Sequence, residues 1–156
     1  FPPLLSAGFH EMTLVEVREL CVTAFPKSLT RKSVMEGLVR VIDKLNRASV
    51  IGEVWVDGSF ATRKIDASDA DILVHVASEL YDSNLTVRDA VWWATLPERK
   101  DTDSCDSYRW VEYSKGHPKF TDSESDRLYW TNWYGYSEVR HVAKGIIVVS
   151  LPAVIA

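Results

Sequence analysis

The sequence predicts an α+β domain in which helices come first and a sheet follows. The chain has 156 residues, the size of one ordinary domain with a sizeable core. Helical stripes of apolar residues occupy positions 14–45, and β-rich runs follow at 53–56, 71–76, 105–113 and 146–151. We therefore predict one domain over residues 1–156, with N-terminal helices in 1–50 and, in 51–151, the sheet with the candidate catalytic motifs.

Two amphipathic helices are predicted near the N-terminus. Thr13 followed by Glu16 has the spacing of a capping box, and Pro26 ends the first segment. Ser33 and Glu36 repeat this spacing, and the second helix runs to about residue 46. The two apolar stripes are Leu14, Val17, Cys21 and Ala24, then Val34, Leu38, Val41, Ile42 and Leu45.

The middle of the chain predicts two strands and a third helix. Residues 53–56 alternate and are β-rich, and Asp57-Gly58 ends this strand. The polar segment 61–68 predicts a short helix or a loop before the strand at 71–76. Residues 79–84 predict a turn, and residues 86–96 have apolar positions at helical spacing before Pro97.

The C-terminal third predicts two more strands. The aromatic and β-branched content of residues 105–113 favours the third strand of the sheet. Residues 114–126 are rich in Ser, Asp, Gly and Pro and predict a long loop. Residues 128–145 show no clear period, whereas IIVVSL at 146–151 is typical of a strand and is ended by Pro152.

Composition bounds the class of protein. The net charge is −4 and the sequence pI is about 5.6, so the surface as a whole is not typical of a nucleic-acid binder. No apolar stretch approaches the roughly 20 residues that cross a bilayer, and the first residues lack the pattern of a signal peptide. We therefore expect a cytoplasmic protein with no membrane contact. Cys21 and Cys105 lack the spacing of a zinc site or a disulfide framework.

Asp69 and Asp71 form the central candidate site. Residues i and i+2 of a strand point to the same face, so these carboxylates project together if the strand begins by Asp69. Two close carboxylates do not both ionise without a shared proton or cation, and Mg²⁺ binds such oxygens together with substrate phosphates. Gly58 lets backbone N–H groups approach phosphate oxygens, and Ser59 adds a hydroxyl. Each motif alone is common in surface turns; their order along two strands favours a functional site.

Gly58-Ser59, nine intervening residues and then Asp69-Ala70-Asp71 resemble the signature of the DNA polymerase β-like nucleotidyltransferase superfamily. The resemblance implies a mixed or antiparallel sheet of about four strands with helices packed on one side. It also implies that the Gly-Ser turn holds a nucleoside triphosphate, that the acids bind two Mg²⁺ ions, and that a third carboxylate from a neighbouring strand completes the metal site.

Asp106 and Glu112 compete for the role of the third carboxylate. Both lie on the same face of the predicted strand by period-2 counting. Asp106 lies at the start of its predicted strand, as Asp69 and Asp71 do in theirs, whereas Glu112 lies about 20 Å farther along the strand. Position therefore favours Asp106, with an ordinary turn aspartate as the alternative.

Nearly the whole chain resembles a bacterial family of minimal nucleotidyltransferase-like proteins. The resemblance rests on DGSFATRK, SDADILV, CDSY and KGIIVVSL, and it departs from the family at Ala143, where Pro is usual before Lys-Gly. Members resemble the small nucleotidyltransferases of toxin–antitoxin and phage-defence loci. This implies a protein acceptor, a cognate toxin or antitoxin partner, or a tRNA acceptor; the acidic net charge favours a protein. Oligomeric state is left open.

Further candidates flank these motifs. Lys64 follows the Gly-Ser turn and Lys144 precedes the last strand; each is a candidate counter-charge for a triphosphate, with a solvated lysine as the alternative. The C-terminal third is rich in aromatic rings, which stack on nucleobases, anchor interfaces or fill a core, and the core is favoured for most of them. These rings are Trp110, Tyr113, Tyr129, Trp130, Trp133, Tyr134 and Tyr136.

Two functions are compatible with these residues. The first is Mg²⁺-dependent nucleotidyl transfer, with Asp69, Asp71 and Asp106 as catalytic metal ligands and with Gly58, Ser59, Lys64 and Lys144 at the triphosphate. The second is a nucleotide-sensing or partner-binding module with the same fold and no transfer chemistry. The intact acid pair and Gly-Ser turn favour the first.

Overall fold

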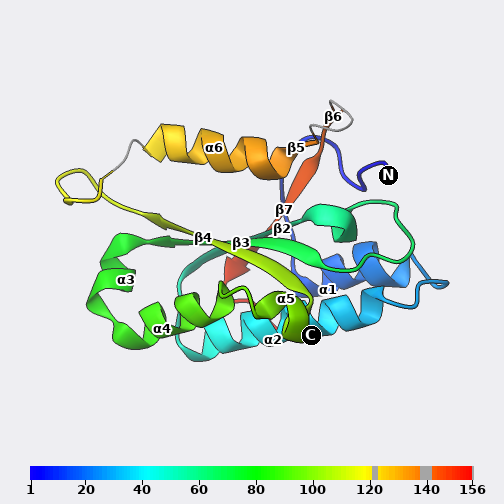
Figure 1. Cartoon of the computed structure of the whole chain (residues 1–156), viewed down its shortest axis with the longest axis horizontal. Helices are drawn as coiled ribbons and strands as arrows, with labels where there is room; N and C mark the ends of the chain where they lie inside the picture. Colours follow the sequence, from blue (N-terminus) through cyan, green and yellow to red (C-terminus); the bar gives the residue numbers. More distant parts are fainter. Residues whose placement is uncertain (121–122, 138–141, 156) are drawn as a thin grey trace.

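A five-stranded mixed sheet forms the centre of the computed structural model, which describes residues 1–120, 123–137 and 142–155 (Figure 1). Within these residues the strand order is β1-β7-β2-β3-β4, and β5 and β6 form a separate pair. The strands are β1 (Gly8–Glu11), β2 (Gly52–Asp57), β3 (Ala70–Ala77), β4 (Cys105–Glu112), β5 (Tyr136–Ser137), β6 (Val142–Ala143) and β7 (Gly145–Leu151). The helices are α1 (Leu14–Arg18), α2 (Arg31–Arg47), α3 (Ser78–Ser83), α4 (Leu85–Ala94), α5 (Arg99–Asp103) and α6 (Ser123–Gly135).

Strand directions bring three strand ends to one end of the sheet. β2 pairs antiparallel with both β3 and β7, whereas β4 pairs parallel with β3 and β1 parallel with β7. The last residue of β2 therefore lies beside the first residues of β3, and the first residues of β4 lie on the other side of β3. We refer to this part of the sheet as the carboxylate end.

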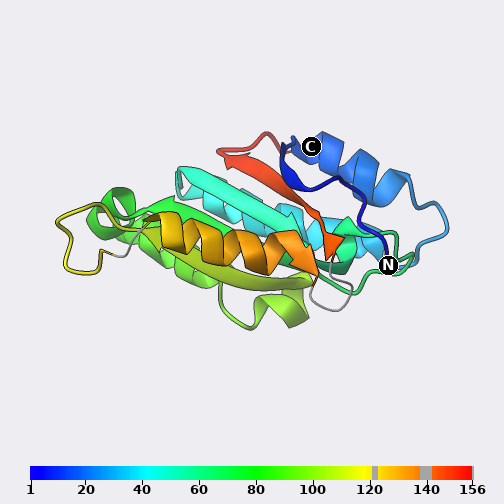
Figure 2. The same ribbon diagram turned by 90° about the horizontal axis from the view of Figure 1, so that it is seen from above.

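Each face of the sheet packs against its own apolar layer. α1, α2 and α4 cover one face, where their apolar stripes pack with inward residues of β2, β3 and β7. α6 lies across the opposite face, on the β3–β4 side of the sheet (Figure 2). The buried residues under α6 are Trp55, Leu73, Trp110, Tyr134, Ile146 and Val148. Both faces are apolar, so both require a cover.

The predicted α+β class and mixed sheet are confirmed, and the strands expected at 53–56, 71–76, 105–113 and 146–151 are present with small shifts at their ends. The expected number of about four strands is too low, because β1 adds a fifth at the edge. β1 has only four residues, all exposed or half-buried, so it carries no alternating signal. The prediction that the helices pack on one side of the sheet is also wrong, because α6 covers the second face (Figure 1).

Short helices occupy two connections between the longer elements. Residues 79–83 of the expected turn 79–84 belong to α3, Asn84 caps α4, and the link before β4 contains α5. The segment expected to be a long loop, 114–126, is irregular to Phe120 and enters α6 at Ser123; residues 121–122 lie outside the described part. None of the described helices is long and apolar enough to span a membrane.

The N-terminal helices follow the predicted stripes but not every predicted cap. Thr13 and Glu16 form the expected reciprocal capping box, and α1 continues into a π-helical turn at Glu19–Thr23. α2 begins earlier than expected, with Thr30 at its N-cap position, and Ser33 donates its hydroxyl to the Thr30 carbonyl instead of capping a helix. The predicted cap at Ser33 is therefore wrong.

Arg31 at the start of α2 is fully buried and organises the chain after β2. Its guanidinium donates to the carbonyls of Phe60 at 2.7 Å, Thr62 at 2.6 Å and Cys21 at 2.9 Å. Ser59, Lys64 and Ile65 supply further carbonyl acceptors, and the guanidinium lies 3.7 Å from the centroid of the Phe25 ring. Burial lowers the pKa of Arg31, but the group stays charged because its ordinary pKa is so high. One cation thus fixes residues 59–65 against α2 and the π-helical turn that follows α1.

Arg31→Lys tests this assignment. An ammonium offers three donors from one point and does not reproduce the planar fork, so several buried carbonyls lose their partner. We expect the free energy of unfolding in urea to fall by about 3 kcal/mol or more. Arg47→Lys is the matched control, because Arg47 is exposed in an ion pair with Asp43, and we expect a change of about 0.5 kcal/mol or less. Equal losses in the two variants would contradict the role of Arg31.

Candidate functional site

Three aspartates form a row across the carboxylate end. Asp71 of β3 pairs in register with Asp57 of β2 on one side and with Asp106 of β4 on the other. Residues paired in register point to the same face, and neighbouring strands are about 4.8 Å apart. This face is the one that α6 covers, because Trp55 and Leu73 lie two residues from Asp57 and Asp71. The row therefore places like charges side by side on the α6 face.

Asp57 is the buried member of the row, with 1% of its surface exposed. Burial raises its pKa to about 7, against the opposing charge and hydrogen bond of Lys144, whose Nζ lies 3.4 Å from Oδ1. The Gly58 N–H also donates to Oδ1 at 2.9 Å. Oδ2 is buried and has no hydrogen-bond partner within the described residues. One carboxyl oxygen of Asp57 is therefore bound to Gly58 and Lys144, and the other is buried without a hydrogen-bond partner among the described residues.

Asp71 and Asp69 also lie close to other negative charges at the carboxylate end. The pKa of Asp71 is raised to about 6, first by burial and then by the charges of Asp69 and Asp106, while the charges of Lys144 and Lys100 oppose the shift. Asp69 lies just before the first residue of β3, and its Oδ2 is 3.9 Å from Nζ of Lys100. Lys100 and Lys144 therefore supply the positive charge beside these carboxylates.

The Gly58-Ser59 turn packs directly against the aspartate row. Gly58 has φ +81°, a backbone conformation that side chains disfavour, and it opens the 3-10 turn Gly58–Ala61. A Cβ built on Gly58 would lie 2.8 Å from the carboxyl group of Asp71. Ser59 Oγ donates to the carbonyl of Asp69 at 3.4 Å. The turn and the aspartates found in the sequence are therefore one contiguous site.

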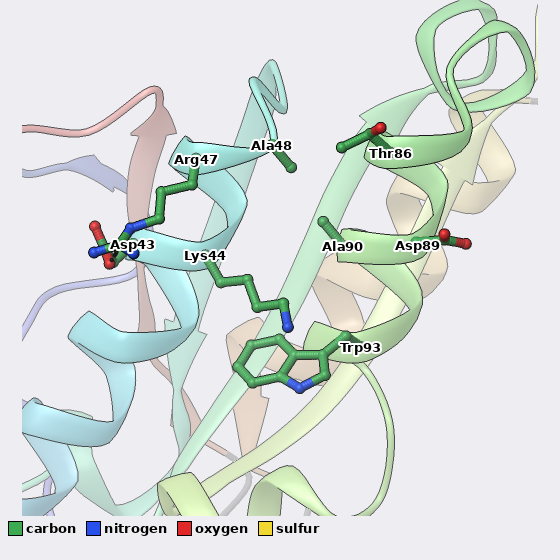
Figure 3. A pocket seen from close by; sticks show the side chains of 8 residues that line it. All are labelled: Asp43, Lys44, Arg47, Ala48, Thr86, Asp89, Ala90 and Trp93. Carbon is green, nitrogen blue, oxygen red and sulfur yellow. Dashed lines mark ion pairs between the residues drawn. The ribbon is translucent and has the colours of Figure 1, made fainter.

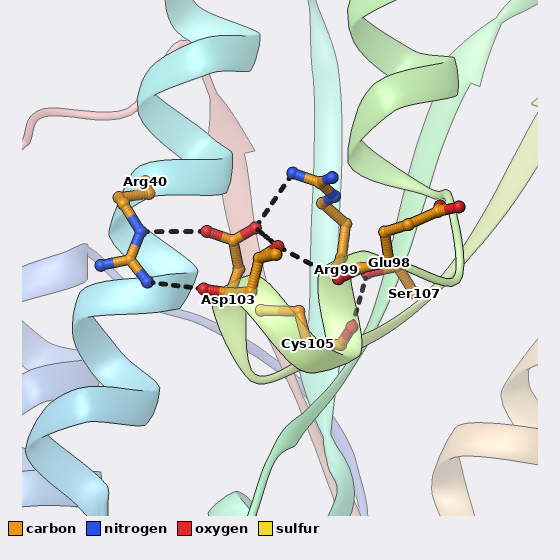
Figure 4. A network of polar contacts seen from close by, with 7 residues as sticks. Arg40, Glu98, Arg99, Asp103, Cys105 and Ser107 are labelled. Atoms are coloured by element: carbon orange, nitrogen blue, oxygen red, sulfur yellow. Dashed lines mark hydrogen bonds and ion pairs between the residues drawn. The ribbon is translucent and has the colours of Figure 1, made fainter.

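A second polar network holds the start of β4 (Figure 4). Asp103 of α5 accepts from Arg40 of α2 at 2.9 Å and from Arg99 at 3.1 Å. Burial alone would raise the pKa of Asp103, but the hydrogen bonds from Thr102 and Arg40 and the charge of Arg99 hold it below its ordinary value. The contact fixes α5 on α2, and α5 carries Lys100 and leads into the strand that carries Asp106.

Two sequence candidates lie away from the row. Glu112 pairs in register with Ala77 at the far end of β4, and its Oε1 lies 3.6 Å from Nε2 of His75. The carbonyl of Lys64 accepts hydrogen bonds from Arg31, and the Lys64 Nζ lies 5.9 Å from the centroid of the Phe1 ring. Within the described residues the Lys64 ammonium forms no ion pair with the aspartates. By contrast, Asp106 belongs to the row, and Lys144 contacts Asp57 within it.

Asp57 and Lys100 were not identified from the sequence, and Tyr134 was named only as one of several aromatic rings. Asp57 had a usable signal, because its parity matches Trp55 and it directly precedes the Gly-Ser turn. Tyr134 donates its hydroxyl to the carbonyl of Ile72 at 2.8 Å and covers the row from α6. Burial raises the pKa of Tyr134, and the charge of Asp71 adds to this shift. Tyr134 and Lys100 reach the site through tertiary contacts that no local pattern encodes.

Magnesium is compatible with the donor chemistry of the row. Carboxylate oxygens are the side-chain ligands that Mg²⁺ prefers, and the unengaged Oδ2 of Asp57 is a buried oxygen without a donor. Within the described part of the chain no group of three acidic, His or Cys side chains is placed closely enough to hold a metal ion. The fit therefore rests on oxygen type and on the register of the strands.

A separate groove lies on the other face of the molecule. It has a volume of about 540 Å³ and runs between α2 and α4 (Figure 3). Nζ of Lys44 lies 4.2 Å from the centroid of the Trp93 ring within it. Its lining residues are Asp43, Lys44, Arg47, Ala48, Thr86, Asp89, Ala90 and Trp93. None of the candidate site residues lines it, so the groove and the aspartate row are distinct.

Comparison with known proteins places the chain in a family. A family model described as a family of unknown function, DUF6932, matches residues 1–150, and the chain belongs to this family. No curated protein and no solved structure matches the chain.

Gly58→Ala tests the contact between the turn and Asp71. The new Cβ meets strain from the positive φ and also a collision with the Asp71 carboxyl group. Gly116→Ala is the matched control, because Gly116 has φ +90° and nothing within 4 Å of the added Cβ. By urea denaturation we expect Gly58→Ala to lose about 1 kcal/mol or more beyond the loss in Gly116→Ala. Equal losses would show that the turn does not press on Asp71.

Asp57→Asn tests the burial of the carboxylate through pH. The pKa of Asp57 is about 7 in the folded protein, above the ordinary value of 3.8. Between these values the unfolded chain has lost the proton that the folded protein retains, so the free energy of unfolding falls as pH rises from 4 to 7. We expect this fall, on the order of a few kcal/mol, to be much smaller in Asp57→Asn when both are measured by urea denaturation in metal-free buffer. Parallel pH profiles would contradict a buried, protonated Asp57.

Proposed function

We propose that the chain is a Mg²⁺-dependent nucleotidyltransferase. It transfers a nucleoside monophosphate from a nucleoside triphosphate to a hydroxyl group of a protein or a tRNA. The proposal is supported above all by the in-register row of Asp57, Asp71 and Asp106, against which the Gly58 turn packs. Such a row concentrates negative charge that a folded protein tolerates poorly, and divalent cations with bound phosphates would relieve this repulsion.

Each element of the site has a role in this reaction. Asp69, Asp71 and Asp106 are the carboxylates that would hold the Mg²⁺ ions, and the ions would supply positive charge for the phosphate oxygens and for the acceptor oxygen. The backbone of Gly58-Ser59 and the Ser59 hydroxyl contact the β- and γ-phosphates. Lys144, beside Asp57, adds a mobile positive charge at the same end. Lys100 orients Asp69.

The chemical step is an in-line displacement at the α-phosphorus. The acceptor oxygen forms a bond to this phosphorus while the bond to the oxygen that bridges to the β-phosphate breaks. Pyrophosphate leaves with that electron pair, and the acceptor proton passes to the carboxylate of Asp106. Tyr134 of α6 lies beside the row, where its hydroxyl donates to the carbonyl of Ile72, and it would help to exclude water from the reaction.

The acceptor follows from charge and from the resemblance to toxin–antitoxin nucleotidyltransferases. A tRNA acceptor requires basic side chains along its phosphates, whereas the chain has a net charge of −4. We therefore favour a protein hydroxyl, as expected for a cognate partner from a toxin–antitoxin or phage-defence pair.

Label transfer tests the proposal. The protein is incubated with Mg²⁺ and each of the four nucleoside triphosphates labelled at the α-phosphate, in the presence of proteins and tRNA from a bacterial lysate. We expect labelled acceptor and released pyrophosphate, and about a hundredfold or greater loss in Asp71→Asn. Chelation of Mg²⁺ should also abolish transfer.

Glu112→Gln is the matched control for the carboxylate substitutions. It removes a charge from the far end of the strand that carries Asp106, and we expect transfer within about twofold of the unchanged protein because Glu112 lies outside the row. Equal transfer by Asp71→Asn and the unchanged protein would refute the proposal. Triphosphate binding without pyrophosphate release would instead favour a nucleotide-sensing module.

A further inference from the structure

Three exposed aromatic rings form a platform beside the aspartate row. Tyr108 of β4 and Tyr129 and Trp133 of α6 have 39%, 57% and 55% of their surface exposed. The Tyr108 and Trp133 ring centroids are 6.1 Å apart in an edge-on arrangement, and those of Tyr129 and Trp133 are 6.3 Å apart and nearly parallel. We call these three residues the aromatic platform.

The platform is not part of the apolar layer under α6. The inward residues of this helix are Trp130 and Tyr134, and Tyr134 is 1% exposed and bonded to the backbone of β3. Tyr129 and Trp133 are also four residues apart, so they share a helix face, but this face meets solvent. Exposed aromatic surface is unfavourable in water unless a ligand or partner covers it.

Tyr108 joins the platform to the aspartate row. It follows Asp106 by two residues and points to the same face of β4. The charge of Asp106 is the main reason that the pKa of Tyr108 is raised, with smaller contributions from burial and from Asp71. The platform therefore borders the row on its β4 side, opposite to the Gly58-Ser59 turn of β2.

We propose that the aromatic platform binds the nucleobase of the nucleoside triphosphate. The inference rests on the proposed function, which puts the β- and γ-phosphates at the turn that follows β2 and the α-phosphate near β3. The nucleoside is attached to the α-phosphate at the side opposite to the β-phosphate, so it extends towards β4. Tyr108, Tyr129 and Trp133 are the rings found there.

A nucleobase suits this surface better than a nucleic-acid strand does. Every base presents a flat π-face that stacks on Tyr or Trp without the need for a charged partner. A strand of several nucleotides would add phosphates next to the aspartates, where negative charge already accumulates. The rings carry few hydrogen-bonding groups, so the platform should accept all four bases.

Calorimetry with two probes separates the base from the phosphates. ATP and tripolyphosphate, each with Mg²⁺, are titrated into the unchanged protein and into Tyr129→Leu and Trp133→Leu. We expect each variant to bind ATP about tenfold more weakly, a loss of about 1.4 kcal/mol, while tripolyphosphate binding stays unchanged. Trp92→Leu is the matched control, because Trp92 is 44% exposed on α4 at the other face of the sheet, and it should leave both affinities unchanged.

The outcomes distinguish the two proposals. If the unchanged protein binds ATP and all variants bind it equally, the platform is refuted and the proposed function stands. An equal loss for ATP and tripolyphosphate would refute a contact to the base, since the variants would then disturb the phosphate site. If neither probe binds the unchanged protein, the proposed function fails together with the platform. Far-UV circular dichroism confirms that each variant is folded.

Discussion

The buried guanidinium of Arg31 is the interaction on which the arrangement of the site depends. The chain between β2 and β3 has to return within a dozen residues, and its carbonyls turn towards the core, where they need donors. A planar cation with five N–H groups supplies these donors from one side chain and tolerates burial because so many carbonyl dipoles face it. Since Ser59 and Phe60 are among its acceptors, the contact that stabilises the loop also sets where the Gly58 turn meets Asp71.

The aspartate row opposes this stability. A sheet end that pairs Asp57, Asp71 and Asp106 across three strands keeps carboxyl groups close together, and burial raises the pKa of the first two towards neutrality. Ordinary sheets avoid like charges in register because each such pair destabilises the fold. Lys144 and Lys100 offset part of the repulsion from opposite sides. A fold that retains such an arrangement is stabilised elsewhere, and clusters of perturbed carboxyl groups are typical of functional sites.

Much of the fold and part of the site could be predicted from local patterns, because alternation and helical stripes report burial directly. The interior strands and α2 are of this kind, and so are Asp69 and Asp71, whose spacing alone predicts a pair. Partners that meet through tertiary contacts could not be predicted this way. Lys100 reaches Asp69 from α5, which Asp103 fixes on α2. The side chain of Lys64 turns towards Phe1, while the carbonyl of Lys64 accepts from Arg31. β1 has no buried residue and so no alternating pattern of burial.

The aromatic segment before β7 shows why composition alone did not separate core from surface. Consecutive positions of α6 point in different directions, so Tyr129 is exposed while Trp130 packs against the buried layer. The hydrophobicity of the two rings is similar, and only the position of the helix over β3 and β4 decides which one is covered. That position is set by Tyr134, whose hydroxyl reaches a β3 carbonyl beside Asp71. The same contact that anchors α6 over the carboxylates therefore turns the remaining rings outward, next to the strand that carries Asp106.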